Sequence, residues 1–412
     1  MDSDTPEPPD FALQPGESWE HLLISSEAGP RALVANAITA LRHAPEWRNT
    51  LRYDEFAERL TIVGQPPIKA INGHWTDTDD VLAAEWLQHQ GIHVKPDVAA
   101  QAAETVARQN PIHPITDYLD GLKWDGRERI DTWLTYYMGV ADTPYARAVG
   151  RRWLISAVAR VRKPGCKADH CLILEGPQGR LKSTALQTLA DPWFTDDLAD
   201  LGSKDAAMQT AGVWIIEMAE LDSLGRADAK RAKAFLARRV DRFRPPYGRR
   251  LIDRKRQCIF AGTTNLSQYL QDETGGRRFW PVEIHTIDLD GIAADRSQLW
   301  AEADHAYKAG DPWWLENEEL RLGAVEQQSA REIDDPWDGR IAEIVSGKSR
   351  VTIADVLTDI GFMNKELDQR SQNRAAKCLI KMGWKRFRYR DGSKLVWGYA
   401  PPEPAMEQTD LL

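Results

Sequence analysis

The first third of the chain places apolar residues at the three- and four-residue spacing of amphipathic helices. The spacing is clearest over residues 31–43 and 97–109, and a further helical pattern has Thr76 or Asp77 as its expected cap. A short apolar run near residues 60–64 is the strand signal of this region. The pattern predicts a mainly α-helical N-terminal domain over residues 17–125.

The pattern changes in the middle of the chain, where short apolar runs alternate with helical stretches. Runs of this length, bounded by polar residues or glycine, are typical of strands that are buried in a parallel sheet. Alternation of strands and helices predicts an α/β domain over residues 126–315. The apolar runs lie at residues 171–174, 213–216, 258–261 and 279–284.

Residues 334–402 show a third pattern. Helical spacing occurs three times and is followed by two alternating runs that flank Asp391 and Gly392, a dipeptide that favours a hairpin turn. Three helices and a hairpin are the elements of a winged helix, which is a variant of the helix-turn-helix. We therefore expect a C-terminal winged-helix domain. The helical patterns lie at residues 340–347, 352–361 and 371–384.

The composition is that of a globular protein, with 42% hydrophobic and 28% charged residues. The sequence has no run of the about 18 apolar residues that a membrane-spanning helix needs. It begins with the acidic, proline-rich segment MDSDTPEPPD, which is unlike a secretory signal, and we expect residues 1–16 to be a disordered tail. These features predict a cytoplasmic protein without a membrane partner.

Four cysteines are scattered along the chain, which suits a reducing compartment better than a disulfide framework. Cys166, His170 and Cys171 lie close together and have the residue types of zinc ligands. No second Cys/His pair follows at zinc-finger spacing, so we interpret the two cysteines as thiols beside a buried strand.

The charge is unevenly distributed. The formal net charge is −9, yet residues 226–256 hold thirteen Lys or Arg and three Asp, which is +10 and leaves −19 for the remainder. A basic segment on an acidic protein fits a site for a polyanion, although a solvated helix face is the simpler explanation of a charge run. Phe243, Tyr247 and two prolines interrupt the run, which favours a loop or hairpin tip over a helix.

A phosphate-binding loop is indicated after the apolar run 171–174. Such loops have a glycine, four free positions and then Gly-Lys-Ser/Thr, and here Leu181 replaces the second glycine. We expect Leu181 to be tolerated as a first-turn helix residue without a backbone penalty. Lys182 is expected to reach the β- and γ-phosphates of ATP and Ser183 to hold Mg²⁺. The predicted nucleotide-binding residues are Gly176, Pro177, Gln178, Gly179, Arg180, Leu181, Lys182, Ser183 and Thr184.

Polar residues that an ATPase needs follow downstream. Glu217 ends an apolar run that we expect to lie beside the loop strand, where a carboxylate holds Mg²⁺, and Glu220 could polarise the attacking water. Asn265 ends another apolar run and could orient that water. Arg277 and Arg278 follow a glycine-rich turn and could neutralise charge on the γ-phosphate, in some systems from a neighbouring subunit. Taken alone, each pair has a simpler explanation as exposed surface charge.

Taken together, these segments resemble the virulence-associated E family of phages, prophages and phage-inducible islands, which is similar to superfamily 3 helicases and the wider AAA+ ATPases. The resemblance covers about residues 20–315. Leu181 departs from the common glycine of the loop. The matching segments are HPITDYLDGLKWDG, PGCKADHCLILEGPQG, KST, WIIEMAELDSL, DRFRPPYGRR, GTTN and TGGRRFWPV.

The resemblance implies an ATP-dependent motor that acts on DNA in the replication of a mobile element, as a ring-shaped homo-oligomer that we expect to be hexameric. It implies that Lys182 and Ser183 are nucleotide ligands, and it makes Asn265 the sensor. Glu217 and Glu220 become the Walker B acids, and Arg277 or Arg278 becomes the arginine finger. Many relatives carry an N-terminal primase domain, for which this chain has no room, so a primase or replication initiator is expected to be a separate partner.

Two DNA contacts are expected. In the helicase group, a DNA-contacting hairpin lies between the acids and the sensor, where this chain has its basic segment. The expected single-strand contacts there are Arg244, Tyr247, Arg249 and Arg250. The C-terminal domain is expected to hold duplex DNA, while Trp384 and Trp397 form its small core. The expected duplex contacts are Arg374, Lys377, Lys381, Lys385 and Arg388.

The leading hypothesis is therefore a DNA-stimulated ATPase, a helicase-like replication protein with an α/β P-loop core, an α-rich N-terminal region and a C-terminal winged helix. One alternative is a non-enzymatic DNA-binding protein with a vestigial loop that interferes with another phage. A second alternative, an unrelated P-loop kinase, leaves the basic segment and the winged helix unexplained. The intact Lys-Ser-Thr, the two acids and the paired arginines favour the enzyme.

Overall fold

The computed structural model describes most of residues 18–402, and the chain forms two compact units, residues 1–331 and 332–412. The tail predicted at residues 1–16 lies outside the described residues. No helix in the described ranges is long and apolar enough to cross a membrane. Further segments outside the described residues are 70–72, 200–202, 220–225, 246–249, 268, 270–277, 332–334, 363–367 and 392–393.

The N-terminal part of the first unit is mainly helical, as its periodicity predicts. Its helices pack around a core that includes Leu41, Trp47 and Leu87. Thr76 caps the second helix, and its backbone N–H donates to the Asp79 carboxylate at 2.7 Å, which confirms the predicted cap. The elements are η1 (Trp19–Leu22), β1 (Ser25–Ser26), β2 (Gly29–Pro30), α1 (Val34–His43), β3 (Leu51–Asp54), β4 (Arg59–Ile62), α2 (Asp77–His89), α3 (Pro96–Arg108), β5 (Pro111–Ile112) and α4 (Pro114–Gly121).

Five parallel strands form the central sheet, in the order β12-β6-β11-β8-β7. Four of them coincide with the predicted apolar runs, which confirms those predictions. The expectation that the run ending in Glu217 lies beside the loop strand is wrong, because β11 pairs with both β6 and β8 and separates them. The strands are β6 (Cys171–Glu175), β7 (Phe194–Thr195), β8 (Ile215–Met218), β11 (Ile259–Thr264) and β12 (Phe279–Glu283).

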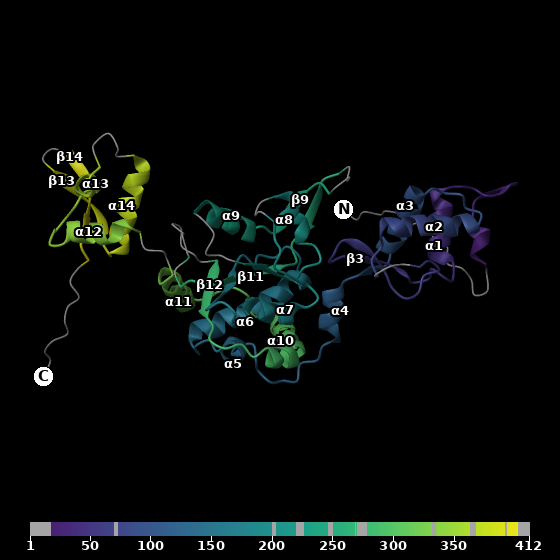
Figure 1. The fold of residues 1–412 in the computed structure, drawn as a ribbon, viewed down its shortest axis with the longest axis horizontal. Helices are drawn as coiled ribbons and strands as arrows, with labels where there is room; N and C mark the ends of the chain where they lie inside the picture. The colour runs from purple at the N-terminus through teal and green to yellow at the C-terminus, as the bar shows by residue number, and fades with distance from the viewer. Residues whose placement is uncertain are drawn as a thin grey trace, which may run out of the picture. The chain divides into compact units, whose positions relative to one another are not determined.

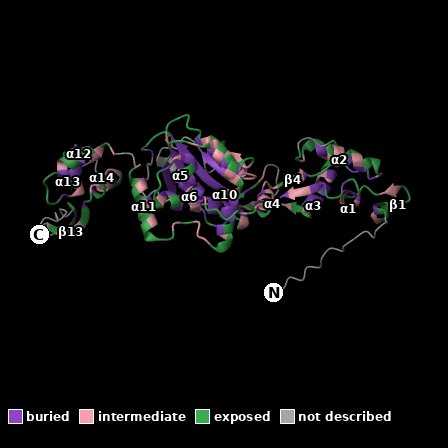
Figure 2. Cartoon of the chain, turned by 90° about the horizontal axis from the view of Figure 1, so that it is seen from below, coloured by how far each residue is buried: buried purple, intermediate pink, exposed green. Residues whose placement is uncertain are grey.

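Helices cover both faces of this sheet. Leu172 and Leu174 of β6 lie in one apolar cluster with α5, α6, α7 and α10, whereas Cys171 and Ile173 lie in a second cluster with α8 and α9. Because alternate strand residues face opposite sides, a strand that is apolar throughout is buried on both faces (Figures 1 and 2). The helices are α5 (Trp133–Met138), α6 (Pro144–Arg162), α7 (Lys182–Ala190), α8 (Lys204–Gln209), α9 (Arg226–Leu236), α10 (Leu289–Ala309) and α11 (Glu318–Ser329).

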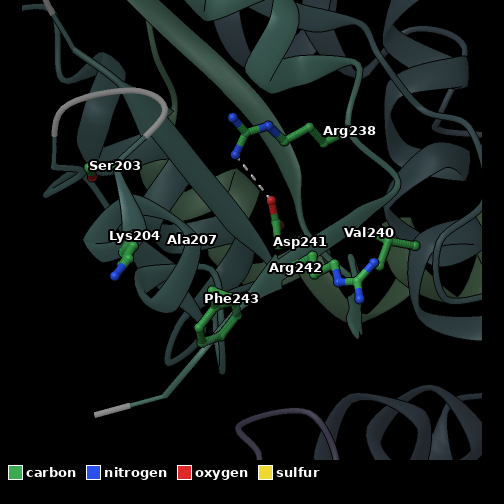
Figure 3. Close-up of a pocket in the computed structure, with 8 residues that line it drawn as sticks. All are labelled: Ser203, Lys204, Ala207, Arg238, Val240, Asp241, Arg242 and Phe243. Carbon is green, nitrogen blue, oxygen red and sulfur yellow. Dashed lines mark ion pairs between the residues drawn. The ribbon is translucent and has the colours of Figure 1, made fainter. Parts of the chain in front are cut away.

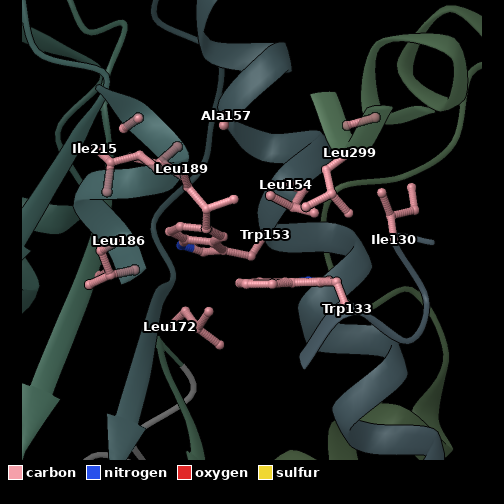
Figure 4. Close-up of a cluster of buried hydrophobic side chains, with 14 of the residues drawn as sticks. Ile130, Trp133, Trp153, Leu154, Ala157, Leu172, Leu186, Leu189, Ile215 and Leu299 are labelled. Atoms are coloured by element: carbon pink, nitrogen blue, oxygen red, sulfur yellow. The ribbon is translucent and has the colours of Figure 1, made fainter. Parts of the chain in front are cut away.

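Tryptophans connect the helices to the sheet. Trp133 and Trp153 stack with their ring centroids 6.0 Å apart in the larger cluster (Figure 4). The Trp153 indole N–H donates to the carbonyl of Phe260 at 2.9 Å, and the Trp214 indole N–H donates to the carbonyl of Ala157 at 3.0 Å. Each bond is a directed contact between α6 and the sheet region, which fixes the position of the helix more specifically than apolar packing alone.

The basic segment has two structures. Its first part forms α9, so the expectation of a loop or hairpin throughout is wrong there. Its second part forms an antiparallel hairpin, β9 (Val240–Phe243) and β10 (Ile252–Lys255), which confirms the predicted hairpin. The inward-facing Asp241 and Phe243 are buried, whereas Arg242 between them is exposed and pairs with Asp253 of β10 at 3.5 Å.

The second unit consists of three helices followed by a hairpin, as the sequence predicts. Its core contains Leu357, Leu379 and Trp384, and Tyr399 of the last strand joins it. Trp384 is 7% exposed, which confirms its predicted core position, but Trp397 is 44% exposed, so the expectation that it packs in the core is wrong. The elements are α12 (Trp337–Val345), α13 (Ile353–Ile360), α14 (Gln369–Lys381), β13 (Lys385–Asp391) and β14 (Lys394–Ala400).

Candidate functional site

The predicted loop leaves the carboxyl end of β6, where the connections of the sheet diverge. From β6 the chain crosses to β7, returns through β8 and β11, and finally crosses to β12 on the other side of β6. Crevices at such a switch point, outside the carboxyl ends of the strands, are where α/β sheets bind ligands. The topology therefore places residues 176–184 where a small-molecule site is expected.

Two glycines shape the loop. A Cβ on Gly176 would lie 3.1 Å from the Ile284 carbonyl oxygen, so glycine is the residue that lets the chain turn this close to its neighbour. Gly179 has a φ of +80°, a left-handed conformation that disfavours side chains. Backbone geometry therefore explains why both positions are occupied by glycine.

Leu181 adopts the same left-handed conformation, with a φ of +61° and a ψ of 27°. It is the residue just before α7 and is half exposed, so little packing offsets the conformation. The expectation that Leu181 sits in the first helical turn without a backbone penalty is therefore wrong. The position does require the conformation that the glycine of the common pattern supplies.

Lys182 is buried and its ammonium group lies within the loop. It donates to the carbonyl oxygens of Gly176 and Pro177 at 2.6 and 3.0 Å and to Oδ1 of Asn265 at 3.0 Å. Asn265 follows β11, so the fold brings together two of the predicted residues that are far apart in the sequence. The ammonium is thus held at the mouth of the loop by oxygen atoms, the kind of partner that phosphate oxygens could replace.

Glu217 lies beside the loop, and its carboxylate accepts hydrogen bonds from two hydroxyl groups. Ser183 donates to Oε1 of Glu217 at 2.8 Å, and Thr263 donates to the same oxygen at 2.5 Å. The Glu217 side chain is 1% exposed, and its Oε2 has no hydrogen-bond partner among the described residues. A buried carboxylate with one unpartnered oxygen is costly unless something else binds it. Together with the Ser183 hydroxyl, it fits the hard oxygen donors that Mg²⁺ prefers.

Thr263 is a site residue to which no motif assigned a role. It lies in β11, the strand that separates β6 from β8, and its hydroxyl reaches a carboxylate 46 positions earlier in the chain. The signal that could have found it is its place in the polar ending Thr-Thr-Asn of a buried strand. The partner was not predictable, because the strand order was unknown.

A second buried carboxylate, Glu175, ends β6 just before the loop. Its Oε1 accepts from the Tyr269 hydroxyl at 2.7 Å and from the Arg331 guanidinium at 2.6 Å. Burial raises the pKa of the Tyr269 phenol, and the neighbouring carboxylate raises it further, so the phenol stays protonated and donating. This cluster joins the start of the loop to the end of the first unit.

Arg278 lies at the amino ends of the parallel strands, whereas Lys182 lies beyond their carboxyl ends. It precedes β12, and its carbonyl accepts from the Cys171 N–H at the amino end of β6, while its guanidinium pairs with Asp169 at 3.2 Å. Since β6 and β12 are parallel and five residues long, the amino and carboxyl ends of these strands are about 16 Å apart. Arg278 therefore cannot reach the loop of its own chain.

Several predicted site residues lie outside the described residues. They are Glu220, Tyr247, Arg249 and Arg277, and their roles stay predictions. His170, from the zinc interpretation, is buried and stacks on Trp280 with centroids 3.8 Å apart. Burial lowers the pKa of His170 to about 3, so its ring is neutral at physiological pH.

The basic hairpin β9–β10 borders a small polar pocket of about 250 Å³ (Figure 3). Three basic residues line it, and the one acid in its lining, Asp241, is already paired with Arg256 at 2.6 Å and with Arg238 at 3.5 Å. Beyond the pocket, Arg244 and Arg250 are exposed on either side of the hairpin tip. The hairpin thus presents excess positive charge. The lining residues are Ser203, Lys204, Ala207, Arg238, Val240, Asp241, Arg242 and Phe243.

In the second unit, the predicted duplex contacts fall into two groups. The Arg374 guanidinium pairs with Asp335 at 2.6 Å and lies 4.0 Å from the Trp337 ring centroid, and Lys381 pairs with Asp338 at 2.8 Å. These two cations of α14 are therefore compensated by acids within the unit. Lys377 is half-buried, whereas Lys385 and Arg388, on the hairpin, are exposed.

Comparison with known proteins shows to which family the chain belongs. The model of the virulence-associated protein E-like domain matches residues 119–333. No curated protein matches the chain. Two apo structures of the NrS-1 C terminal region are similar at 11% identity: one, of residues 305–718, covers 85% of this chain and 95% of that chain with a TM-score of 0.47, and the other, an A form, covers 85% and 96% with a TM-score of 0.45.

The matched region contains the whole central sheet, the loop and the basic hairpin. It spans more than half of the 412 residues. The chain therefore belongs to the family that carries the virulence-associated protein E-like domain.

Proposed function

We propose that the protein hydrolyses ATP at the carboxyl edge of the central sheet. The observation that carries the proposal is the cluster in which Lys182 contacts Asn265 while Ser183 and Thr263 share the Glu217 carboxylate. A lysine, a hydroxyl, a carboxylate and an amide around a strand–loop–helix unit are the groups that phosphoryl transfer uses. On this proposal, the sheet is the core of a P-loop ATPase.

Lys182 binds the β- and γ-phosphates of ATP in this proposal. The oxygen atoms that accept from its ammonium group include two loop carbonyls and the Asn265 amide, which are neutral, and negatively charged phosphate oxygens would be stronger acceptors. A fixed positive charge beside the transferred group stabilises the transition state. The N-terminus of α7, which begins at Lys182, adds positive potential and backbone N–H groups that have no partner within the helix.

Ser183 and Glu217 hold Mg²⁺ in this proposal, because the unpartnered Oε2 of Glu217 and the serine hydroxyl are oxygen donors of the right kind. Bound Mg²⁺ supplies positive charge that offsets the charge of the phosphates. Thr263 positions the carboxylate. Glu220 is proposed to polarise the attacking water and Asn265 to orient it.

The arginine finger is proposed to act between subunits. Arg278 lies about 16 Å from the loop of its own chain, at the other edge of the sheet. In a ring of copies, the amino ends of the strands in one subunit could face the nucleotide that is bound to the neighbouring subunit. Arg277, the adjacent residue, is the other candidate for the same role. We therefore propose a homo-oligomer, with a hexamer as the expected form.

Hydrolysis is proposed to be coupled to DNA during replication of a phage or another mobile element. The family membership and the excess positive charge of the β9–β10 hairpin support this. Arg244 and Arg250 would contact the backbone of a single strand, and the second unit, proposed to be a winged helix, would add a further contact. A primase or replication initiator is a proposed partner in this process.

The test is ATP hydrolysis by the full chain and by two variants. Lys182→Ala should abolish hydrolysis, and Glu217→Gln should raise the Mg²⁺ concentration that gives half-maximal hydrolysis, because the carboxamide is a weaker ligand for a cation. Circular dichroism of both variants should match the parent. If Lys182→Ala hydrolyses ATP at the parent rate, the site is elsewhere, and the alternative of a DNA-binding protein with a vestigial loop is favoured.

A further inference from the structure

One face of the β13–β14 hairpin combines arginines with exposed apolar side chains. Arg386, Arg388 and Arg390 alternate along β13, so they point to the same face. Trp397 pairs directly with Arg388, and Leu395 pairs with Arg390, which puts both on that face. Trp397 is 44% exposed and Leu395 is 60% exposed. We call these five residues the arginine face.

Two arginines hold the Trp397 ring at the surface. The Arg386 and Arg388 guanidinium carbons lie 4.1 and 4.4 Å from the ring centroid, within the range of cation–π attraction. Tyr399, which pairs with Arg386 and so lies on the same face, is buried in the core of the unit, so the open part of this face is the part that carries Trp397 and Leu395. Nucleic-acid bases stack both on aromatic rings and on guanidinium planes, so the pair of groups offers a stacking platform.

Among the described residues, no acid pairs with the arginines of this face. Within the described part of the chain, no ion pair involves Arg386, Arg388 or Arg390, in contrast to Arg374 and Lys381 of α14, which pair with acids. Residues two apart in a strand are separated by about 6.8 Å. The three arginines therefore leave β13 at a regular spacing, and the guanidinium groups of Arg386 and Arg388 converge on the Trp397 ring, where they could contact the phosphates that flank a stacked base.

We propose that the arginine face binds single-stranded nucleic acid, with the arginines on phosphates and a base stacked at Trp397. A duplex hides the faces of its bases, so an exposed ring on an open sheet would have nothing to stack on there. A membrane surface would need a larger apolar area than Trp397 and Leu395 provide. The sequence pattern favours duplex DNA on this unit, but the pairing of Arg374 and Lys381 removes two of the five cations expected to contact it.

This proposal concerns the DNA-binding half of the proposed function and is independent of ATP hydrolysis. It is therefore tested without nucleotide, on the full chain. The probe is a short single-stranded oligodeoxynucleotide that contains iodouracil, a photoreactive base that crosslinks to aromatic side chains against which it stacks. Peptide mapping by mass spectrometry distinguishes a crosslink at Trp397 from one on the β9–β10 hairpin, so binding there does not confuse the result.

We expect a crosslink on the peptide that contains Trp397. In Arg386→Gln/Arg388→Gln, half-maximal crosslinking should need more oligonucleotide, and the log–log salt slope should fall by about 1.4, since each phosphate that is no longer neutralised lowers it by about 0.7. The matched control is Arg48→Gln/Lys69→Gln, which removes two exposed cations from the other unit and should leave the crosslink unchanged. A Lys182→Ala variant should also crosslink as the parent does.

Fluorescence anisotropy with the same single strand gives a second measurement. Trp397→Ala should weaken binding by at least about fivefold, the lower end of the effect of removing a stacked ring, and Trp397→Phe should restore most of it. Trp314→Ala, which removes an exposed tryptophan from the first unit, is the control and should bind as the parent does.

Three results would overturn the proposal. The first is the absence of a crosslink at Trp397 while crosslinks form elsewhere on the chain. The second is equal crosslinking at Trp397 by a blunt duplex that carries the same base. The third is that Trp397→Ala no longer binds phosphatidylserine vesicles but keeps its affinity for the single strand, which would assign the face to a membrane surface. None of these outcomes would alter the ATPase result for Lys182→Ala.

Discussion

Leu181 occupies a backbone conformation that suits glycine, and this leads to a prediction about stability. The left-handed conformation costs a leucine about 1–2 kcal/mol, whereas glycine adopts it freely but is disfavoured by about 0.5–1 kcal/mol through its larger unfolded-state entropy. Leu181→Gly should therefore leave the free energy of unfolding unchanged or raise it by up to about 1.5 kcal/mol. Urea denaturation measures this change.

The control for that variant is Leu181→Val, which keeps an apolar side chain but adds β-branching. A branched residue fits the left-handed region worse than leucine, so this variant should be less stable than the parent. Stability of Leu181→Gly below that of Leu181→Val would contradict the assigned conformation.

Thr263 gives a second prediction at the scale of a residue. Its hydroxyl donates to the buried Glu217 carboxylate, so Thr263→Val should destabilise the protein by about 1–3 kcal/mol and raise the Mg²⁺ concentration for half-maximal ATP hydrolysis. Thr263→Ser keeps the donor and should restore the Mg²⁺ response. If valine and serine give the same Mg²⁺ response, Thr263 does not position the carboxylate.

The candidate site could be predicted from the sequence only where residue type and strand ends carry the signal. Lys182, Ser183, Glu217 and Asn265 each follow or end an apolar run, and the fold brings them together. The pair of Glu175 and Arg331 was not predicted, because 156 positions separate them and the pattern gave neither residue a role. Such contacts depend on tertiary packing, which periodicity does not encode.

The elements could be predicted better than their arrangement. Short apolar runs correctly indicated β6, β8, β11 and β12, since strands that are buried on both faces are apolar throughout. The insertion of β11 between β6 and β8 could not be predicted, because periodicity says nothing of strand order. The same limit explains Trp397: alternation puts Trp397 and Tyr399 on one face of the hairpin, and only packing decides that Tyr399 is buried while Trp397 is exposed.

The β9–β10 hairpin gives a prediction at the scale of an element. Arg244→Gln/Arg250→Gln should weaken binding of single-stranded DNA and lower its stimulation of ATP hydrolysis, and the log–log salt slope should fall by up to about 1.4. The comparison is Arg48→Gln/Lys69→Gln, which removes the same charge from another part of the first unit. Equal effects of the two double variants would mean that only net charge matters and that the hairpin does not contact DNA.

At the scale of the whole molecule, the position of Arg278 predicts that active sites form between copies of the chain. A mixture of Lys182→Ala with Arg277→Ala/Arg278→Ala should recover part of the ATPase, because each variant supplies the group that the other lacks. Light scattering in the presence of ATP and DNA should detect an oligomer.

The control for the arginine variant is Asp169→Asn, which breaks the same ion pair but keeps the arginine. It should retain ATP hydrolysis, so that inactivity of the arginine variant is not explained by the broken pair. Absence of recovery at every mixing ratio, from a monomeric protein, would contradict a finger that acts across subunits.

Coupling of the loop to DNA is the point on which the proposed function depends, and it can be measured on the unmodified protein. The ATPase rate of the full chain is determined with and without single-stranded DNA, beside that of Lys182→Ala. We expect hydrolysis by the parent, a severalfold increase on adding single-stranded DNA, and no hydrolysis by the variant under either condition. A parent rate that is zero, or that DNA leaves unchanged, would contradict a DNA-coupled ATPase.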